Sequence, residues 1–134
     1  MSGLLSNIRV LDLSRVLSGP WATQMLADFG ADVIKVERPG IGDDVRQQGS
    51  RLKDLDGNDT DERSTFLALN RGKRSVTIDM ATAGGQALIR RLAAASDVVV
   101  ENFKSGDLAR YGLDHASLAR VNPKLVYCSI TGFG

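Results

Sequence analysis

Short apolar runs alternate with longer amphipathic segments along most of the chain. Each run is rich in β-branched or aliphatic residues and is short enough for a buried strand. The predicted strands are Ile8–Leu13, Val33–Val36, Arg74–Met80, Asp97–Val100 and Leu125–Ile130. Helical segments lie between most of them, which favours parallel pairing. The pattern predicts an α/β protein with a Rossmann-like parallel sheet and flanking helices.

Three segments carry the helical pattern. The first begins at Pro20, a residue suited to the first helical position, and ends before Gly30. The second spans Ala81–Ala95, and two shorter helical pieces within Ser105–Val121 are divided at Gly112-Leu113. The apolar spacing predicts which side chains are buried: Ala22, Met25, Leu26 and Phe29 in the first helix, and Leu88, Leu92 and Ala95 in the second.

Residues 39–64 interrupt this alternation. The segment is polar and keeps neither the period of a strand nor that of a helix. Loops of this length are usually functional or mobile. We expect a surface loop within one domain. We also expect residues 1–134 to be the N-terminal part of a longer protein, since the last predicted strand is not followed by a covering helix.

Composition narrows the function classes. The 134 residues fit one domain, with 43% hydrophobic and 25% charged residues. With a net charge of +1, the chain has no broad basic or acidic field that would indicate binding to nucleic acid or a membrane. The lone Cys128 is expected to be buried and inert, and the lone His115 to be structural. No cysteine–histidine cluster predicts a metal site, and without a leader-like or membrane-spanning run we expect a cytoplasmic protein.

Candidate chemistry follows the predicted strands, because ligands of such sheets bind beyond the carboxyl ends of the strands. The loop Ser18-Gly19-Pro20 opens a helix, whose free N–H groups favour an anion, although the G-x-G-x-x-G fingerprint is absent. Glu37 lies 18 positions after Gly19, near the spacing of a ribose-binding acid, and Arg38 follows it. A phosphorylated adenosine ribose fits this pair, so NADP and coenzyme A (CoA) are both open.

Two further strand ends add polar and aromatic groups. Asp79-Met80-Ala81 follows one, and Asn102-Phe103-Lys104 follows the other. An amide and an aromatic ring could hold an adenine or a pantetheine arm, and Lys104 and Arg110 could bind phosphates. Glu101 could be a general base or a capping group.

Four segments together resemble one family. They are VLDLSRVLSGPWATQMLADFGADVIKVERPG, LNRGKRSVTIDM, VVVENFKSGDLARYGL and NPKLVYCSITGFG. In order and spacing they are similar to the class III CoA transferases, which include formyl-CoA transferase, the carnitine and bile-acid CoA transferases and α-methylacyl-CoA racemase. The resemblance covers nearly the whole chain and implies CoA in place of NADP. The CoA contacts it implies are Leu17, Ser18, Arg38, Ile78, Asp79, Met80, Ala81, Asn102, Phe103, Lys104 and Arg110.

The resemblance also implies a mechanism and an assembly. A family member moves CoA from an acyl-CoA to a carboxylic acid through an aspartyl anhydride and an enzyme thioester, without a prosthetic group or metal. The implied nucleophile lies beyond Gly134, so no catalytic residue and no second domain is expected in this chain. The implied full-length form is an interlocked homodimer.

Two positions depart from the formyl-CoA transferase pattern. Ala81 replaces a lysine, and Leu17 replaces a glutamine close to the reacting groups. These differences favour a carboxylic acid other than formate or oxalate. Three other functions stay open on the sequence: an acyl-CoA racemase of the same family, a non-catalytic CoA-binding module, and an NADP-binding fragment of an oxidoreductase.

Overall fold

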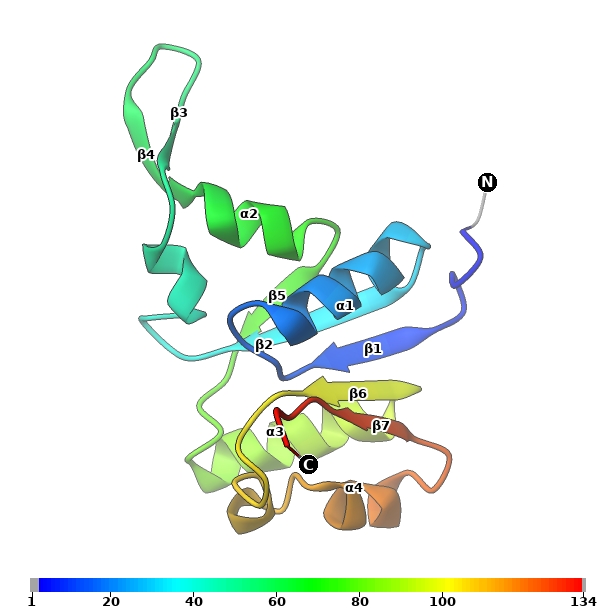
Figure 1. Cartoon of the computed structure of the whole chain (residues 1–134). Helices are drawn as coiled ribbons and strands as arrows, with labels where there is room; N and C mark the ends of the chain where they lie inside the picture. The colour runs from blue at the N-terminus through cyan, green and yellow to red at the C-terminus, as the bar shows by residue number, and fades with distance from the viewer. Residues whose placement is uncertain (1–2, 134) are drawn as a thin grey trace.

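Five parallel strands form the centre of the protein. The computed structural model describes residues 3–133. Its main sheet contains β1 (Arg9–Asp12), β2 (Asp32–Glu37), β5 (Arg74–Thr77), β6 (Val98–Glu101) and β7 (Val126–Ser129), in the order β5-β2-β1-β6-β7. Every pairing is parallel, with Val10 opposite Val33 on one side and Val98 on the other. The predicted α/β class and all five predicted strands are confirmed (Figure 1).

Helices pack against both faces of this sheet. Alternate residues point to opposite faces of a strand. On one face, Leu11 and Val99 pack with residues of α3 (Ala83–Ala94) and α4 (His115–Val121). On the other, Val10 and Val33 pack with Leu26 of α1 (Ser18–Asp28). The short 3-10 helix η2 (Ala109–Tyr111) precedes α4, and Gly112 divides the two with φ +64°, as the sequence predicts.

The predicted helix faces are partly wrong. In α1 the buried residues include Thr23 and Gln24, whereas Met25 and Phe29 are each 52% exposed. The apolar spacing is misleading here because the inward side of α1 carries a hydroxyl that binds a buried carboxylate, Thr23 Oγ1 to Asp12 Oδ2 at 2.6 Å. In α3 the inward face is displaced by one position, and its buried residues are Gly85, Ile89 and Ala93.

Residues 39–64 hold regular elements that the sequence pattern does not predict. The 3-10 helix η1 (Asp44–Gln47) is followed by an antiparallel hairpin of β3 (Arg51–Lys53) and β4 (Asp59–Arg63), and α2 (Ser64–Asn70) comes directly after. The hairpin projects away from the main sheet in Figure 1. Its strands are largely exposed on both sides, so no alternation of apolar residues marks them.

Cys128 is exposed, so the expectation that it is buried is wrong. It lies in β7, which pairs only with β6 at the edge of the sheet. Tyr127 points to the face covered by α3 and α4 and joins its core. Val126 and Cys128 alternate to the opposite face, which the residues of α1 do not cover at this edge.

Two neighbouring glycines at the start of α3 give a matched test of this packing. A Cβ on Gly85 would lie 1.8 Å from the backbone oxygen of Asp79, whereas a Cβ on Gly84 would meet nothing within 4 Å. We expect Gly85→Ala to lower the free energy of unfolding by about 1–3 kcal/mol through the clash. Gly84→Ala should raise it by about 0.5–1 kcal/mol, because alanine favours the helix. Urea unfolding of both variants measures this, and equal midpoints would contradict the packing at Asp79.

Candidate functional site

A cavity of about 240 Å³ opens at the carboxyl ends of four strands. Residues that follow β1, β2, β5 and β6 contribute to it, together with the segment around η2. This is the crevice in which parallel α/β sheets bind ligands. Its lining residues are Leu13, Arg15, Val36, Glu37, Arg38, Gly42, Asp43, Asp79, Met80, Ala81, Phe103, Asp107, Arg110 and Tyr111.

The structure brings together six of the residues that the sequence predicts to bind the ligand. The six that line this cavity are Arg38, Asp79, Met80, Ala81, Phe103 and Arg110. Asn102 and Lys104 line a shallower hollow that shares Phe103 with it. Ile78 is buried in the core. Leu17 and Ser18 are exposed at the start of α1, outside the lining.

Guanidinium groups and aromatic rings both line the cavity. The Nη2 atom of Arg38 lies 2.5 Å from Asp44 Oδ1. The guanidinium carbon of Arg15 lies 4.6 Å from the centroid of the Phe103 ring, and that of Arg110 lies 4.8 Å from that of Tyr111. Such cations can bind phosphates, and the rings offer apolar surface to a base.

Glu37 does not have the role that its spacing predicts. Its side chain is buried, and both carboxylate oxygens accept hydrogen bonds within the protein. The donors are Arg46 Nε at 2.6 Å, Arg46 Nη2 at 2.8 Å, Ser75 Oγ at 2.6 Å and Asp43 N at 3.0 Å. Glu37 therefore anchors the segment 42–46 beneath the cavity, and its carboxylate is not free to hold a ribose hydroxyl.

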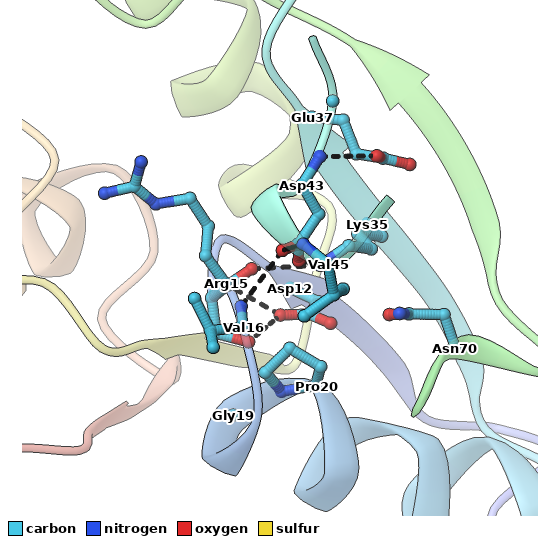
Figure 2. A network of polar contacts seen from close by, with 12 residues as sticks. Asp12, Arg15, Val16, Gly19, Pro20, Lys35, Glu37, Asp43, Val45 and Asn70 are labelled. Atoms are coloured by element: carbon cyan, nitrogen blue, oxygen red, sulfur yellow. Dashed lines mark hydrogen bonds and ion pairs between the residues drawn. The ribbon is translucent and has the colours of Figure 1, made fainter. Parts of the chain in front are cut away.

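A buried network of four charges lies beside the cavity, and Figure 2 shows most of its members. The Nζ atom of Lys73 donates to Asp12 Oδ2 at 2.9 Å, and that of Lys35 lies 2.8 Å from Asp43 Oδ2. All four side chains are at most 2% exposed. Two cations face two anions, so the charges balance where water cannot compensate them.

The two lysines also tie neighbouring elements together. Lys73 Nζ donates to the carbonyl oxygen of Pro20 at 2.8 Å and to Asn70 Oδ1 at 2.9 Å. Lys35 Nζ donates to the carbonyl oxygen of Ser14 at 3.0 Å. The ends of β1 and α2 and the start of α1 are thereby held at fixed positions.

Charge coupling sets the ionisation of this network. Burial lowers the pKa of Lys73 to about 8, although Asp12 opposes the shift. Burial alone would raise the pKa of Asp12, but Lys35 and Lys73 lower it below its ordinary value. Sequence reasoning missed the network, and the one signal for it was a lysine inside the apolar run of β2.

The network leads to a clamped loop between β1 and α1. Asp43 Oδ1 accepts hydrogen bonds from Val16 N at 3.1 Å and from Val45 N at 3.2 Å. The side chain of Asn102 binds the backbone of Arg15, the residue before Val16. Its Oδ1 atom accepts a hydrogen bond from Arg15 N at 2.8 Å, and its Nδ2 atom donates one to Arg15 O at 2.7 Å. Val16 has φ +68°, a left-handed conformation that is unusual for a β-branched residue. The amide of Asn102, predicted to contact the ligand, thus holds this loop.

The remaining candidates have internal roles. The ring of His115 lies 5.6 Å from that of Tyr127. Glu101 Oε2 accepts a hydrogen bond from Phe103 N at 2.8 Å, which fits the capping alternative. Within residues 3–133, no helix has the length and apolar character to cross a membrane. In the same part of the chain, no group of three or more His, Cys, Asp or Glu side chains is arranged to hold a metal ion.

Comparison with known proteins decides the family. Residues 5–134 match CoA-transferase family III. The chain belongs to this family. Over 130 residues it is 57% identical to a succinate–glutarate CoA-transferase of Agrobacterium fabrum, covering 97% of this chain and 32% of that protein. A formyl-CoA:oxalate CoA-transferase of Afipia carboxidovorans is 46% identical over 134 residues, which are 100% of this chain and 30% of that protein.

Two solved structures share the fold. A CAIB/BAIF family protein from Brucella suis superposes with a TM-score of 0.91 at 51% identity, over 100% of this chain and 35% of that one. Rv3272 from Mycobacterium tuberculosis gives 0.88 at 41% identity, over 99% of this chain and 36% of that one. The chain spans about a third of the length of these relatives.

The Glu37 contacts predict a dependence of stability on acid. Burial alone would raise the pKa of Glu37, but the hydrogen bonds from Arg46 and Ser75 lower it to about 2, from an ordinary value of 4.5. The unfolded chain therefore binds the proton first as the pH falls, and the stabilisation by Glu37 is lost between about pH 4.5 and pH 2. Glu37→Gln should lower the free energy of unfolding at pH 7 by about 1.5–3 kcal/mol.

Urea unfolding of the wild type and the variant from pH 7 to pH 2 measures this difference. The difference in free energy of unfolding between the wild type and Glu37→Gln should narrow below about pH 4.5. Asp56→Asn is the control, since Asp56 is exposed in the turn of the hairpin. A gap that stays constant down to pH 2 would show that Glu37 is not held ionised by these contacts.

Proposed function

We propose that this protein is a class III CoA-transferase, which moves CoA from an acyl-CoA thioester to a carboxylic acid, and that residues 1–134 supply its CoA site. One observation carries the proposal. In a chain of this family, cationic and aromatic side chains that follow β1, β2 and β6 gather around one cavity, together with Arg110 and Tyr111 of η2. CoA presents an adenine ring, a 3′-phosphate and a 5′-diphosphate, which match apolar surface and guanidinium groups.

The relatives suggest the substrates. A succinate–glutarate CoA-transferase is 57% identical to this chain, and a succinyl-CoA:glutarate CoA-transferase of Mus musculus is 44% identical. We infer that CoA passes between two short dicarboxylic acids, such as succinate and glutarate. Leu17 and Ala81, which differ from the formyl-CoA transferase pattern, fit this inference.

The covalent step is assigned to another part of the protein. In the proposed reaction an aspartate carboxylate attacks the acyl-CoA, which gives a mixed anhydride and the CoA thiolate. The thiolate then attacks the aspartyl carbonyl, releases the first acid and leaves an enzyme thioester, from which CoA passes to the acceptor acid. In residues 3–133 Asp12 is ion-paired and fully buried, which makes it unsuited to this attack. We propose that the nucleophile lies beyond Gly134 and that the complete protein is a cytoplasmic homodimer.

The direct test is transfer of CoA between acids. The complete protein, purified and incubated with succinyl-CoA and glutarate, should form glutaryl-CoA and free succinate in equal amounts, as measured by chromatography and mass spectrometry. Oxalate in place of glutarate should be a much poorer acceptor. Isomerisation of a 2-methylacyl-CoA without any transfer would instead establish a racemase. If CoA binds but neither reaction occurs, the protein is a binding module.

Arg38 is expected to bind the 3′-phosphate of CoA. It lines the cavity beyond β2, and its guanidinium would exchange Asp44 for the phosphate. Arg38→Ala should weaken CoA by about tenfold or more, since hydrogen bonds to a charged group contribute about 1.5–3 kcal/mol. The affinity for dephospho-CoA, which lacks the 3′-phosphate, should fall much less.

Isothermal titration of the two ligands separates these outcomes. Arg120→Ala, on the exposed side of α4, is the matched control and should bind both ligands as the wild type does. If the Arg38 variant loses the same factor of affinity for CoA and for dephospho-CoA, a contact between Arg38 and the 3′-phosphate is contradicted.

A further inference from the structure

We propose that Arg15, which the sequence did not single out, binds the 5′-diphosphate of CoA, and that the clamp on its backbone fixes it for this contact. This inference rests on the proposed function and adds a specificity-determining residue to it. Arg15 follows β1 and lines the cavity next to Phe103.

Arg15 differs from the other two arginines of the cavity in its charge balance. Arg38 is paired with Asp44 at 2.5 Å, and Arg110 has Asp107 at 4.0 Å. Among residues 3–133, no carboxylate lies within ion-pair distance of the Arg15 guanidinium. Its contact is the ring of Phe103, which supports the guanidinium plane without neutralising it. The positive charge therefore stays available to an anionic ligand.

The backbone at Arg15 is fixed more firmly than an ordinary surface loop. Asn102 binds both its N–H and its carbonyl group, at 2.8 and 2.7 Å. The next residue, Val16, is held at φ +68° by a hydrogen bond to the buried Asp43. Figure 2 shows the Val16 backbone directed at Asp43, with the Arg15 side chain extending to the other side. A conformation unfavourable for valine persists where surrounding contacts impose it, often at ligand sites.

The order of the strands indicates which group of CoA Arg15 meets. Across the cavity the strand ends follow the order β5, β2, β1, β6. Arg38 follows β2 and Arg15 follows β1, and adjacent strands lie about 4.8 Å apart. In CoA the 3′-phosphate and the 5′-diphosphate are carried by the same ribose. β2 has β5 and β1 as neighbours, and the residues after β5 that line the cavity include Asp79 and no cation. With the 3′-phosphate at Arg38, the diphosphate therefore falls on the side of β1, where Arg15 lies.

Binding of three ligands tests this assignment: CoA, dephospho-CoA, and adenosine 3′-phosphate, which lacks the 5′-diphosphate. Arg15→Gln should weaken CoA and dephospho-CoA by the same factor, about tenfold or more, because both carry the diphosphate. The affinity for adenosine 3′-phosphate should change by less than about twofold, which corresponds to about 0.4 kcal/mol and would show that the cavity is intact. Arg15→Lys should recover part of the lost affinity, since it keeps the charge.

The other outcomes would overturn the inference. If the Arg15→Gln variant binds every ligand with the affinity of the wild type, Arg15 does not contact CoA. A loss of affinity confined to CoA would assign Arg15 to the 3′-phosphate. A similar loss for all three ligands would make its role structural. If the wild type binds none of them, the proposed CoA site itself fails, an outcome distinct from failure of the Arg15 assignment alone.

Discussion

Two ion pairs in the interior, Asp12 with Lys73 and Lys35 with Asp43, fix the arrangement on which the cavity depends. Their members come from the end of β1, the interior of β2, the segment before η1 and the residue before β5. Removing charges from water is costly, and only close, balanced pairing with further hydrogen bonds compensates for it. Here two cations balance two anions, and hydroxyl, amide and backbone groups supply further hydrogen bonds. In the described part of the chain, Asp43 Oδ2 has Lys35 as its ion-pair partner and no hydrogen bond.

The same interior contacts extend outward to the ligand site. Asp43 is ion-paired to Lys35 through one oxygen and holds Val16 through the other, so one carboxylate links the buried network to the loop that carries Arg15. On the other side of that loop, Asn102 connects the ends of β1 and β6. A cavity walled by separate strand ends is thereby preorganised, which reduces the ordering that a flexible ligand would otherwise have to impose.

Sequence reasoning succeeded where local pattern and structure agree. The strands are short apolar runs, and the breaks at Gly30 and Gly112 coincide with left-handed backbone, so the sheet and most helices could be predicted. It failed where polar side chains are buried because they pair with one another. Thr23 lies on the inward face of α1 and binds Asp12, and Glu37 is ion-paired with Arg46. Asp12 lies 11 positions from Thr23 and Arg46 lies 9 positions from Glu37, so the period of a single helix or strand does not indicate these pairings. Arg15 was missed for the same reason, because its clamp comes from Asn102, 87 positions away.

The balanced interior charges also bear on how this family can diverge. Positions 12, 35, 43 and 73 are far apart along the chain, yet a neutral substitution at any one would strand an opposite charge at a cost of about 3–5 kcal/mol. That loss would consume much of the 5–15 kcal/mol by which a typical domain is stable. Replacing both members of a pair together leaves no stranded charge. In related proteins, the two members of each pair are therefore expected to be substituted together, because the energetic cost depends on the pair and not on either position alone.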